Sequence, residues 1–156
     1  MSKKSISISV KSMIVLLVLT GIACCIMMNR IINYILPGFS GTTHYCWLIF
    51  IITCAVPCFC ALIPAWIISS NIRDGKSFCL SNVKHMKEIG ILMTIDTILV
   101  FVMNIVFYIL KMSFPALFVA FFLIFAIFFS ISVCAFALSS LIRNASELQD
   151  QSDLTI

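Results

Sequence analysis

Long uncharged, apolar stretches dominate the pattern of hydrophobic and polar positions along the chain. Residues 12–29, 31–72 and 112–142 carry no charged side chain, and residues 89–110 carry one, Asp96. A helix needs roughly 20 apolar residues to cross a bilayer. The pattern therefore predicts an all-α, polytopic membrane protein, a bundle of four transmembrane helices, with spans at about 12–34, 46–69, 89–110 and 115–142.

The segments between and after the spans are polar. We assign residues 1–143 to a single transmembrane domain, with a connection at 70–88 between the second and third spans, and residues 144–156 to an acidic tail. The first span follows three lysines and resembles a signal peptide. We expect it to be retained, because its apolar run continues past Cys24.

Local signals predict where the later helices begin and end. Ser81 or Asn82 is a candidate N-cap for the third helix, and Pro115 suits the first turn of the fourth. In the tail, Leu148 keeps the helical spacing of the apolar residues before it, so we expect the fourth helix to continue from the span into water.

Composition supports the membrane assignment. The chain has 156 residues, of which 62% are hydrophobic and 10% are charged, whereas soluble domains average about 45–50% apolar and about 25% charged residues. A soluble domain of this size could not bury so much apolar surface. These values exclude a disordered chain, a nucleic-acid-binding arm and most soluble enzymes.

Positive charges predict the orientation. The net charge is +4, and the Lys and Arg residues lie at the edges of the spans. If both termini and the middle connection lie inside, eight Lys and Arg residues are cytoplasmic and two, Arg30 and Lys111, are not. The positive-inside rule therefore predicts a multi-pass protein of the cell membrane with its N-terminus and C-terminus in the cytoplasm.

Asp96 is the most unusual residue in the spans. An ionised carboxylate at the bilayer centre costs at least about 2.5 kcal/mol, so we expect this side chain to face the other helices. Thr97 and Asn104 fall on nearly the same helical face, with Thr94 and Asp96 on either side. This intramembrane polar sector favours hydrogen bonds between helices, and the alternative is a proton or cation relay, or a ligand contact.

Eight cysteines raise the question of redox or metal chemistry. Cys54 and Cys58 stand one helical turn apart and could share a face, but the sequence contains no C-x-x-C pair, and zinc usually takes four ligands. It also contains no phosphate-binding loop, metal-ligand cluster or Ser/His/Asp set. We therefore expect the cysteines to pack as small apolar residues, and we expect no cofactor, no metal and no enzymatic activity.

Small residues recur at four-residue spacing in the last span, at Ala126, Ser130 and Cys134. Small side chains let helices approach closely. We expect this stripe to pack against another helix, either within the chain or in a second copy, in which case the protein is a homo-oligomer.

Two cytoplasmic segments are candidate binding surfaces. The basic connection contains Arg73, Lys76, Lys84 and Lys87, which could hold anionic lipid headgroups or an acidic partner, although orientation alone explains them about as well. The tail has an apolar tip after an acidic stretch, which is typical of a short docking peptide or of a plain soluble end. Its candidate docking residues are Asp153, Leu154, Thr155 and Ile156.

Two stretches of the chain resemble a known family. The first comprises Gly75-Lys76-Ser77-Phe78, Asn82-Val83-Lys84 and Ile89-Gly90, and the second comprises Glu147-Leu148 and Ser152-Asp153-Leu154-Thr155-Ile156. They are similar to the bacterial membrane family known as domain of unknown function 2975, whose members have a similar length, four spans and a tail that often ends in Asp-Leu-Thr-Ile. Where the family often has Leu-Arg before Ile-Gly, this chain has Lys87-Glu88.

The resemblance implies no catalytic residue. It suggests a membrane partner for a transcription factor, because genes of the family are frequently found beside small helix-turn-helix regulators of the Xre type. We therefore predict a non-enzymatic membrane sensor or regulator that lies in the lipid bilayer, binds a cytoplasmic regulator of this type and has no direct contact with nucleic acid. The alternative is a small transporter or channel subunit with Asp96 as an ion-coupled site.

Overall fold

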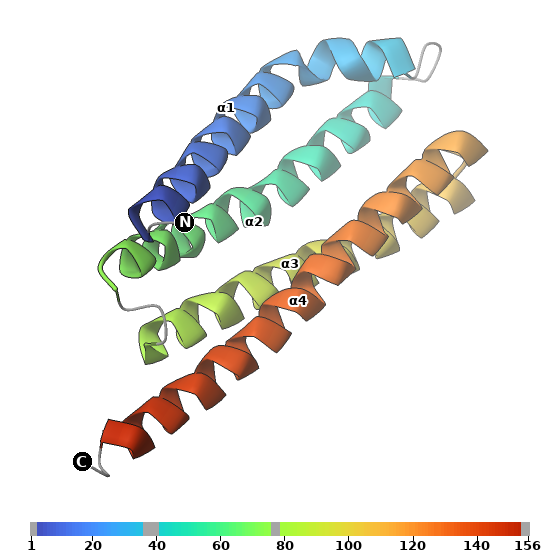
Figure 1. Ribbon diagram of the computed structural model, residues 1–156. Helices are drawn as coiled ribbons and strands as arrows, with labels where there is room; N and C mark the ends of the chain where they lie inside the picture. Colours follow the sequence, from blue (N-terminus) through green and yellow to red (C-terminus); the bar gives the residue numbers. More distant parts are fainter. Residues whose placement is uncertain (1–2, 36–40, 76–78, 154–156) are drawn as a thin grey trace.

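The computed structural model describes residues 3–35, 41–75 and 79–153 of the chain. The described part contains no strand and forms four helices (Figure 1), which are α1 (Lys3–Ile35), α2 (Gly41–Arg73), α3 (Leu80–Ile109) and α4 (Pro115–Asp153). Each of these helices contains a segment that is long and apolar enough to cross a membrane. The prediction of an all-α membrane protein with four spanning helices is confirmed.

Successive helices pack against one another. Backbone contacts join α1 to α2, α2 to α3 and α3 to α4. The chain runs back and forth, so that the start of α1, the end of α2, the start of α3 and the end of α4 lie at one end of the molecule (Figure 1). We call this end the terminal end. Its position in the cytoplasm stays a prediction.

The ends of the helices follow the sequence signals in part. α4 begins at Pro115, as predicted, and continues beyond the predicted span to Asp153. Proline fits the first helical position because the N–H that it lacks would have no partner within the helix. The predicted cap of α3 is wrong, because the helix begins at Leu80 after an N-cap residue, Cys79, that makes no side-chain capping bond. Asn82 lies inside the helix, and its side chain bonds to α2 instead.

A tight turn joins α3 to α4. The N–H of Met112 donates to the carbonyl of Phe107 at 2.9 Å, and the N–H of Lys111 donates to the carbonyl of Tyr108 at 3.1 Å. These two bonds form a Schellman motif, in which the residue after the helix takes a left-handed conformation. Here that residue is Lys111, with φ of 55°. The turn reverses the chain and sets α4 beside α3.

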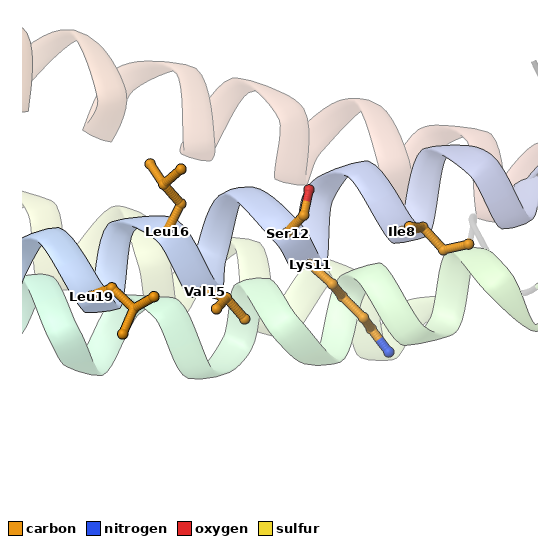
Figure 2. Close-up of a pocket in the computed structure, with 6 residues that line it drawn as sticks. All are labelled: Ile8, Lys11, Ser12, Val15, Leu16 and Leu19. Carbon is orange, nitrogen blue, oxygen red and sulfur yellow. The ribbon is translucent and has the colours of Figure 1, made fainter.

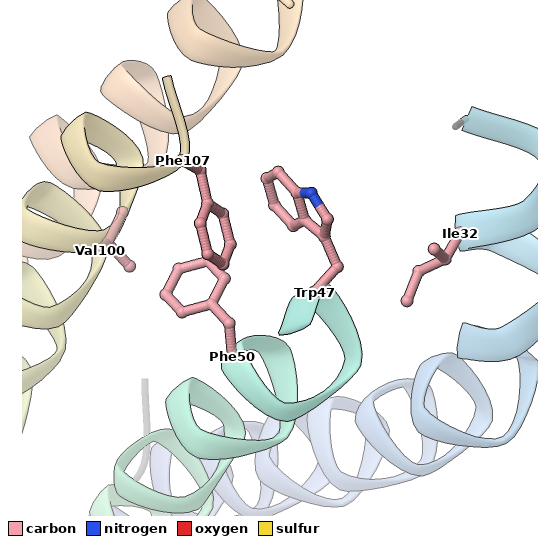
Figure 3. Close-up of a cluster of buried hydrophobic side chains, with 5 residues drawn as sticks. All are labelled: Ile32, Trp47, Phe50, Val100 and Phe107. Carbon is pink, nitrogen blue, oxygen red and sulfur yellow. The ribbon is translucent and has the colours of Figure 1, made fainter. Parts of the chain in front are cut away.

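An aromatic core holds α2, α3 and α4 together at the end away from the chain termini (Figure 3). Trp47 of α2 lies with its ring centroid 4.6 Å from that of Phe107 in α3 and 5.2 Å from that of Phe121 in α4. The Trp47 indole N–H donates to the carbonyl of Met112 at 3.0 Å, so its polar group is bonded although the residue is only 2% exposed. The buried cluster comprises Ile32, Trp47, Phe50, Val100 and Phe107.

Two glycines let paired helices approach closely. A Cβ atom on Gly21 of α1 would lie 2.6 Å from Cζ of Phe59 in α2, and a Cβ atom on Gly90 of α3 would lie 3.0 Å from Cζ of Phe136 in α4. In each pair the phenyl ring occupies the space that a side chain would need. Close packing of this kind drives helix association in lipid, where the hydrophobic effect between helices is absent.

We expect Trp47→Ala to lower the stability of the protein more than any other tryptophan substitution. Removing a buried Trp side chain costs about 3–5 kcal/mol in soluble cores, whereas Trp47→Phe keeps most of the packing and loses one hydrogen bond, at about 0.6 kcal/mol. Thermal unfolding in detergent micelles measures the difference. The matched control is Trp66→Ala, because Trp66 is 42% exposed; equal losses at the two positions would contradict the assignment of the core.

Candidate functional site

The predicted intramembrane polar sector lies on α3, which packs between α2 and α4. Asp96, Thr97 and Asn104 are buried, and Thr94 is partly buried. The hydroxyl of Thr97 donates to the carbonyl of Met93 within α3, at 2.7 Å. Asp96 bonds to α2, whereas Thr94 and Asn104 bond to α4. The sector is therefore divided between two helix interfaces and does not form one polar cluster.

Asp96 lies at the interface between α3 and α2. The residue is 0% exposed, and the thiol of Cys58 in α2 donates to its Oδ2 at 3.0 Å. The second carboxyl oxygen, Oδ1, is also buried and has no hydrogen-bond partner among the described residues. Leaving a buried acceptor without a partner costs about 1–3 kcal/mol. A ligand with a donor group would therefore gain a hydrogen bond at this oxygen, and a proton bound to either carboxyl oxygen would remove the negative charge.

Cys58 is a residue of this site that the sequence analysis treated as a packing residue. The available signal was the one-turn spacing of Cys54 and Cys58, which suggested a shared face of the second span. Cys58 meets the carboxyl group of Asp96, and Cys54 is partly buried. Within the part of the chain that the structure describes, no three His, Cys, Asp or Glu side chains lie close enough together to hold a metal ion.

Thr94 and Asn104 join α3 to α4. The hydroxyl oxygens of Thr94 and Ser132 lie 2.7 Å apart, and both hydroxyls lie within hydrogen-bond distance of the Gly90 carbonyl, at 2.8 and 3.1 Å. Nearer the turn, Nδ2 of Asn104 donates to the carbonyl of Phe118 at 3.0 Å. These contacts are the interhelical hydrogen bonds that the sequence favoured for the sector.

A second set of polar contacts lies at the terminal end. Ser7 of α1 and Ser69 of α2 are both buried, and the hydroxyl of each lies within hydrogen-bond distance of the other's carbonyl, at 2.8 and 3.1 Å. Nδ2 of Asn71, in the last turn of α2, donates to Oδ1 of Asn82 in α3 at 2.7 Å. These bonds fix α1 to α2 and α2 to α3 at the same level.

α4 is joined to α3 at the same level of the bundle. The hydroxyl of the buried residue Ser139 donates to the carbonyl of Val83 at 3.3 Å. All four helices are thus linked in succession by hydrogen bonds at the terminal end. The sequence analysis did not single out these side chains, because short polar residues at span edges carry no distinctive spacing. We call this set the polar layer, and its side chains are those of Ser7, Ser69, Asn71, Asn82 and Ser139.

The described part of the basic connection lies at the surface. Arg73 and Asp74 form an exposed ion pair with Nε and Oδ1 3.4 Å apart, a contact that contributes at most about 1 kcal/mol. Lys84 and Lys87 are exposed on the first turns of α3. Lys76 lies outside the described residues. The described cations therefore stand at the surface of the terminal end, and their contact with headgroups or a partner stays a prediction.

The tail continues α4 as a polar helix. Nε of Arg143 lies 2.9 Å from Oε1 of Glu147, and Ser146, between them, is 7% exposed. The described start of the tail therefore has one buried position, Ser146, among exposed and partly buried neighbours. Of the four candidate docking residues, Asp153 ends the described helix without a described side chain, and Leu154, Thr155 and Ile156 lie outside the described residues.

The stripe of small residues on α4 has no packing role within the described chain. Ala126, Ser130 and Cys134 are all exposed, and the Ser130 hydroxyl donates to the carbonyl of Ala126 in its own helix, at 2.8 Å. Packing within the chain was one of two expectations for this stripe, and this expectation is wrong, because α4 turns a different face toward α3. Packing against a second copy stays a prediction.

We expect Cys58→Ala and Asp96→Asn to be energetically coupled, because their side chains share a hydrogen bond. Interhelical hydrogen bonds in membranes average about 0.6 kcal/mol and reach about 1.7 kcal/mol. A double-mutant cycle on unfolding in detergent micelles measures this coupling. The matched control replaces Cys58→Ala with Cys60→Ala, since Cys60 is exposed and should be additive with Asp96→Asn. Additivity at Cys58 as well would contradict the contact.

Comparison with known proteins places the chain in a family. Residues 10–156 match the family model described as "Protein of unknown function (DUF2975)". Searches of the curated proteins and of the solved structures give no match. The matched range includes all of α2, α3 and α4, both stretches on which the resemblance rests, and most of α1. The chain therefore belongs to the DUF2975 family of proteins of unknown function.

Proposed function

We propose that the protein is a non-enzymatic membrane sensor or regulator, which responds to a membrane condition or ligand and binds a cytoplasmic helix-turn-helix transcription factor at its terminal end. The resemblance to a family encoded beside such regulators suggests the class of partner. In this proposal the described helices receive the signal in the bilayer, and the surface at the terminal end transmits it.

The observation that carries the proposal is that α4 packs against the start of α3 near the end of its span and keeps a buried residue beyond that span. Ser139 bonds to Val83, and Ser146 is buried one turn beyond the predicted span. The basic connection and the tail were two separate candidate surfaces in the sequence. These observations support treating them as one surface, which would combine the exposed side chains of Lys84 and Lys87 on α3 with the helical extension of α4.

The polar layer supports a route from the spans to this surface. It links α1, α2, α3 and α4 in succession by hydrogen bonds from buried or partly buried side chains to neighbouring helices. A change in the packing of one span would break or re-form these bonds, because hydrogen bonds tolerate little change in distance and angle. The binding surface begins immediately beyond the layer, so such a change would reach it directly.

We expect removal of residues 144–156 to abolish recovery of the partner from membranes, because it deletes half of the proposed surface. The measurement is co-purification of the tagged protein with the helix-turn-helix regulator encoded by the adjacent gene. A double charge reversal, Lys84→Glu with Lys87→Glu, tests the other half without shortening the chain. The matched control is Lys111→Glu at the opposite end. Unchanged recovery with both terminal-end variants would refute the proposal.

Transport is a second candidate function, and the unpartnered Oδ1 of Asp96 is the observation that favours it. A buried carboxyl group in a span is a common feature of proton and ion pathways. The contact with Cys58 leaves one carboxyl oxygen available for a proton or a ligand.

Asp96→Asn separates the two candidate functions. If the protein is a transporter or channel subunit, this variant should lose ion-coupled flux in reconstituted vesicles, because an amide cannot exchange a proton or carry a negative charge. If the protein is a regulator, flux should be unchanged or absent in both forms, while expression of a reporter under the regulator's promoter changes. Adding Asn104→Asp to the Asp96→Asn variant should restore neither the flux nor the reporter expression, because Asn104 bonds to α4 and not to α2.

A further inference from the structure

A shallow groove, open to the surroundings and formed by residues of one helix only, runs along one face of α1. It has a volume of about 520 Å³ and is lined by Ile8, Lys11, Ser12, Val15, Leu16 and Leu19. Figure 2 shows Lys11, Val15 and Leu19 on one side of the helix and Ser12 and Leu16 on the other. Four of the six lining side chains are aliphatic, and in the bilayer such a surface is covered by acyl chains or by another helix.

Lys11 supplies the charge in this lining. Its ammonium group lies 4.8 Å from the ring centroid of Trp66 in α2, a cation–π contact that positions the group without neutralising its charge. The hydroxyl of Ser12 donates to the carbonyl of Ser9 at 2.9 Å. Lys11 is absent from the ion pairs among the described residues, so its positive charge remains available to an anion.

The position of Lys11 matches the headgroup level of a membrane. It lies just before the uncharged run that starts at residue 12, and its partner Trp66 is of the residue type enriched at membrane interfaces. From Lys11 to Leu19 the helix rises about 12 Å, which is within the ~15 Å depth of one hydrocarbon leaflet. The groove therefore has a cationic end at the interface and an apolar part of leaflet depth.

We propose that this groove binds one anionic phospholipid, with the headgroup phosphate beside Lys11 and an acyl chain along Val15, Leu16 and Leu19. A zwitterionic lipid presents the same phosphate, but its own ammonium group offsets the attraction to Lys11. The charge of the groove therefore selects an anionic lipid. The proposal depends on α1 and Trp66 and does not depend on the regulator or transport functions.

Trp66 is a native reporter of this site. In the Trp47→Phe background it is the one remaining tryptophan, and it is 42% exposed beside Lys11. The test is to reconstitute this protein in phosphatidylcholine vesicles and to compare quenching of Trp66 fluorescence by brominated phosphatidylglycerol and by brominated phosphatidylcholine at equal mole fractions. Phosphatidylglycerol should be enriched at Trp66 about fivefold, the factor that corresponds to ~1 kcal/mol for one cation near anionic lipid.

Three variants assign the enrichment to Lys11. Lys11→Gln should remove it and Lys11→Arg should keep it, while Lys4→Gln, which removes an exposed cation of the same helix outside the groove, should leave it unchanged. Each variant is scored by the ratio of the two lipids, so a change in Trp66 emission cancels. If Trp47→Phe fails to fold, the unmodified chain serves, because Trp47 is 2% exposed and adds a constant background.

The remaining outcomes overturn the proposal. Equal quenching by the two lipids would show that the groove does not select charge. Equal losses with Lys4→Gln and Lys11→Gln would show diffuse attraction to the whole terminal end. Weak quenching by both lipids that rises when the protein is diluted in the bilayer would show that a second copy of the chain covers the groove.

Discussion

Hydrogen bonds from α3 to its two neighbours are the interactions on which the rest of the structure depends. In lipid, backbone polar groups are satisfied within each helix, and apolar contacts between helices compete with equally apolar acyl chains. The contacts that set position are therefore polar or very close. Asp96 bonds to Cys58 on one side of α3, and Thr94 and Asn104 bond to α4 on the other. These bonds fix the rotation of α3 between α2 and α4.

Close packing adds to this constraint in both hairpins. A phenyl ring from the second helix of each hairpin sits against a glycine of the first, Phe59 against Gly21 and Phe136 against Gly90. The aromatic core around Trp47 then joins α2, α3 and α4 at one end, and the polar layer joins all four helices at the other. The outer faces of α1 and α4 keep large exposed aliphatic side chains, which suit contact with acyl chains.

The proposed functions use different parts of this framework. A regulator would use the terminal end, where the polar layer passes into the surface made by the basic connection and the extension of α4. A transporter would use the middle of α3, where Oδ1 of Asp96 is buried without a described partner. The proposed lipid groove on α1 begins at Ile8, next to Ser7 of the polar layer. A lipid bound in the groove would therefore lie at the same end of the bundle.

The sequence by itself determined the four spanning helices, the start of α4 at Pro115 and the inward position of Asp96. These features follow from the length of apolar runs, from the fit of proline to a first helical turn and from the cost of an exposed carboxylate in lipid, and all three are properties of a single segment. Tertiary structure alone decided that Cys58 meets Asp96, that Asn82 bonds to Asn71 rather than capping α3, and that the stripe from Ala126 to Cys134 faces outward. Such pairings depend on how each helix is rotated and shifted against its neighbour. The spacing of residues within one helix does not specify that register.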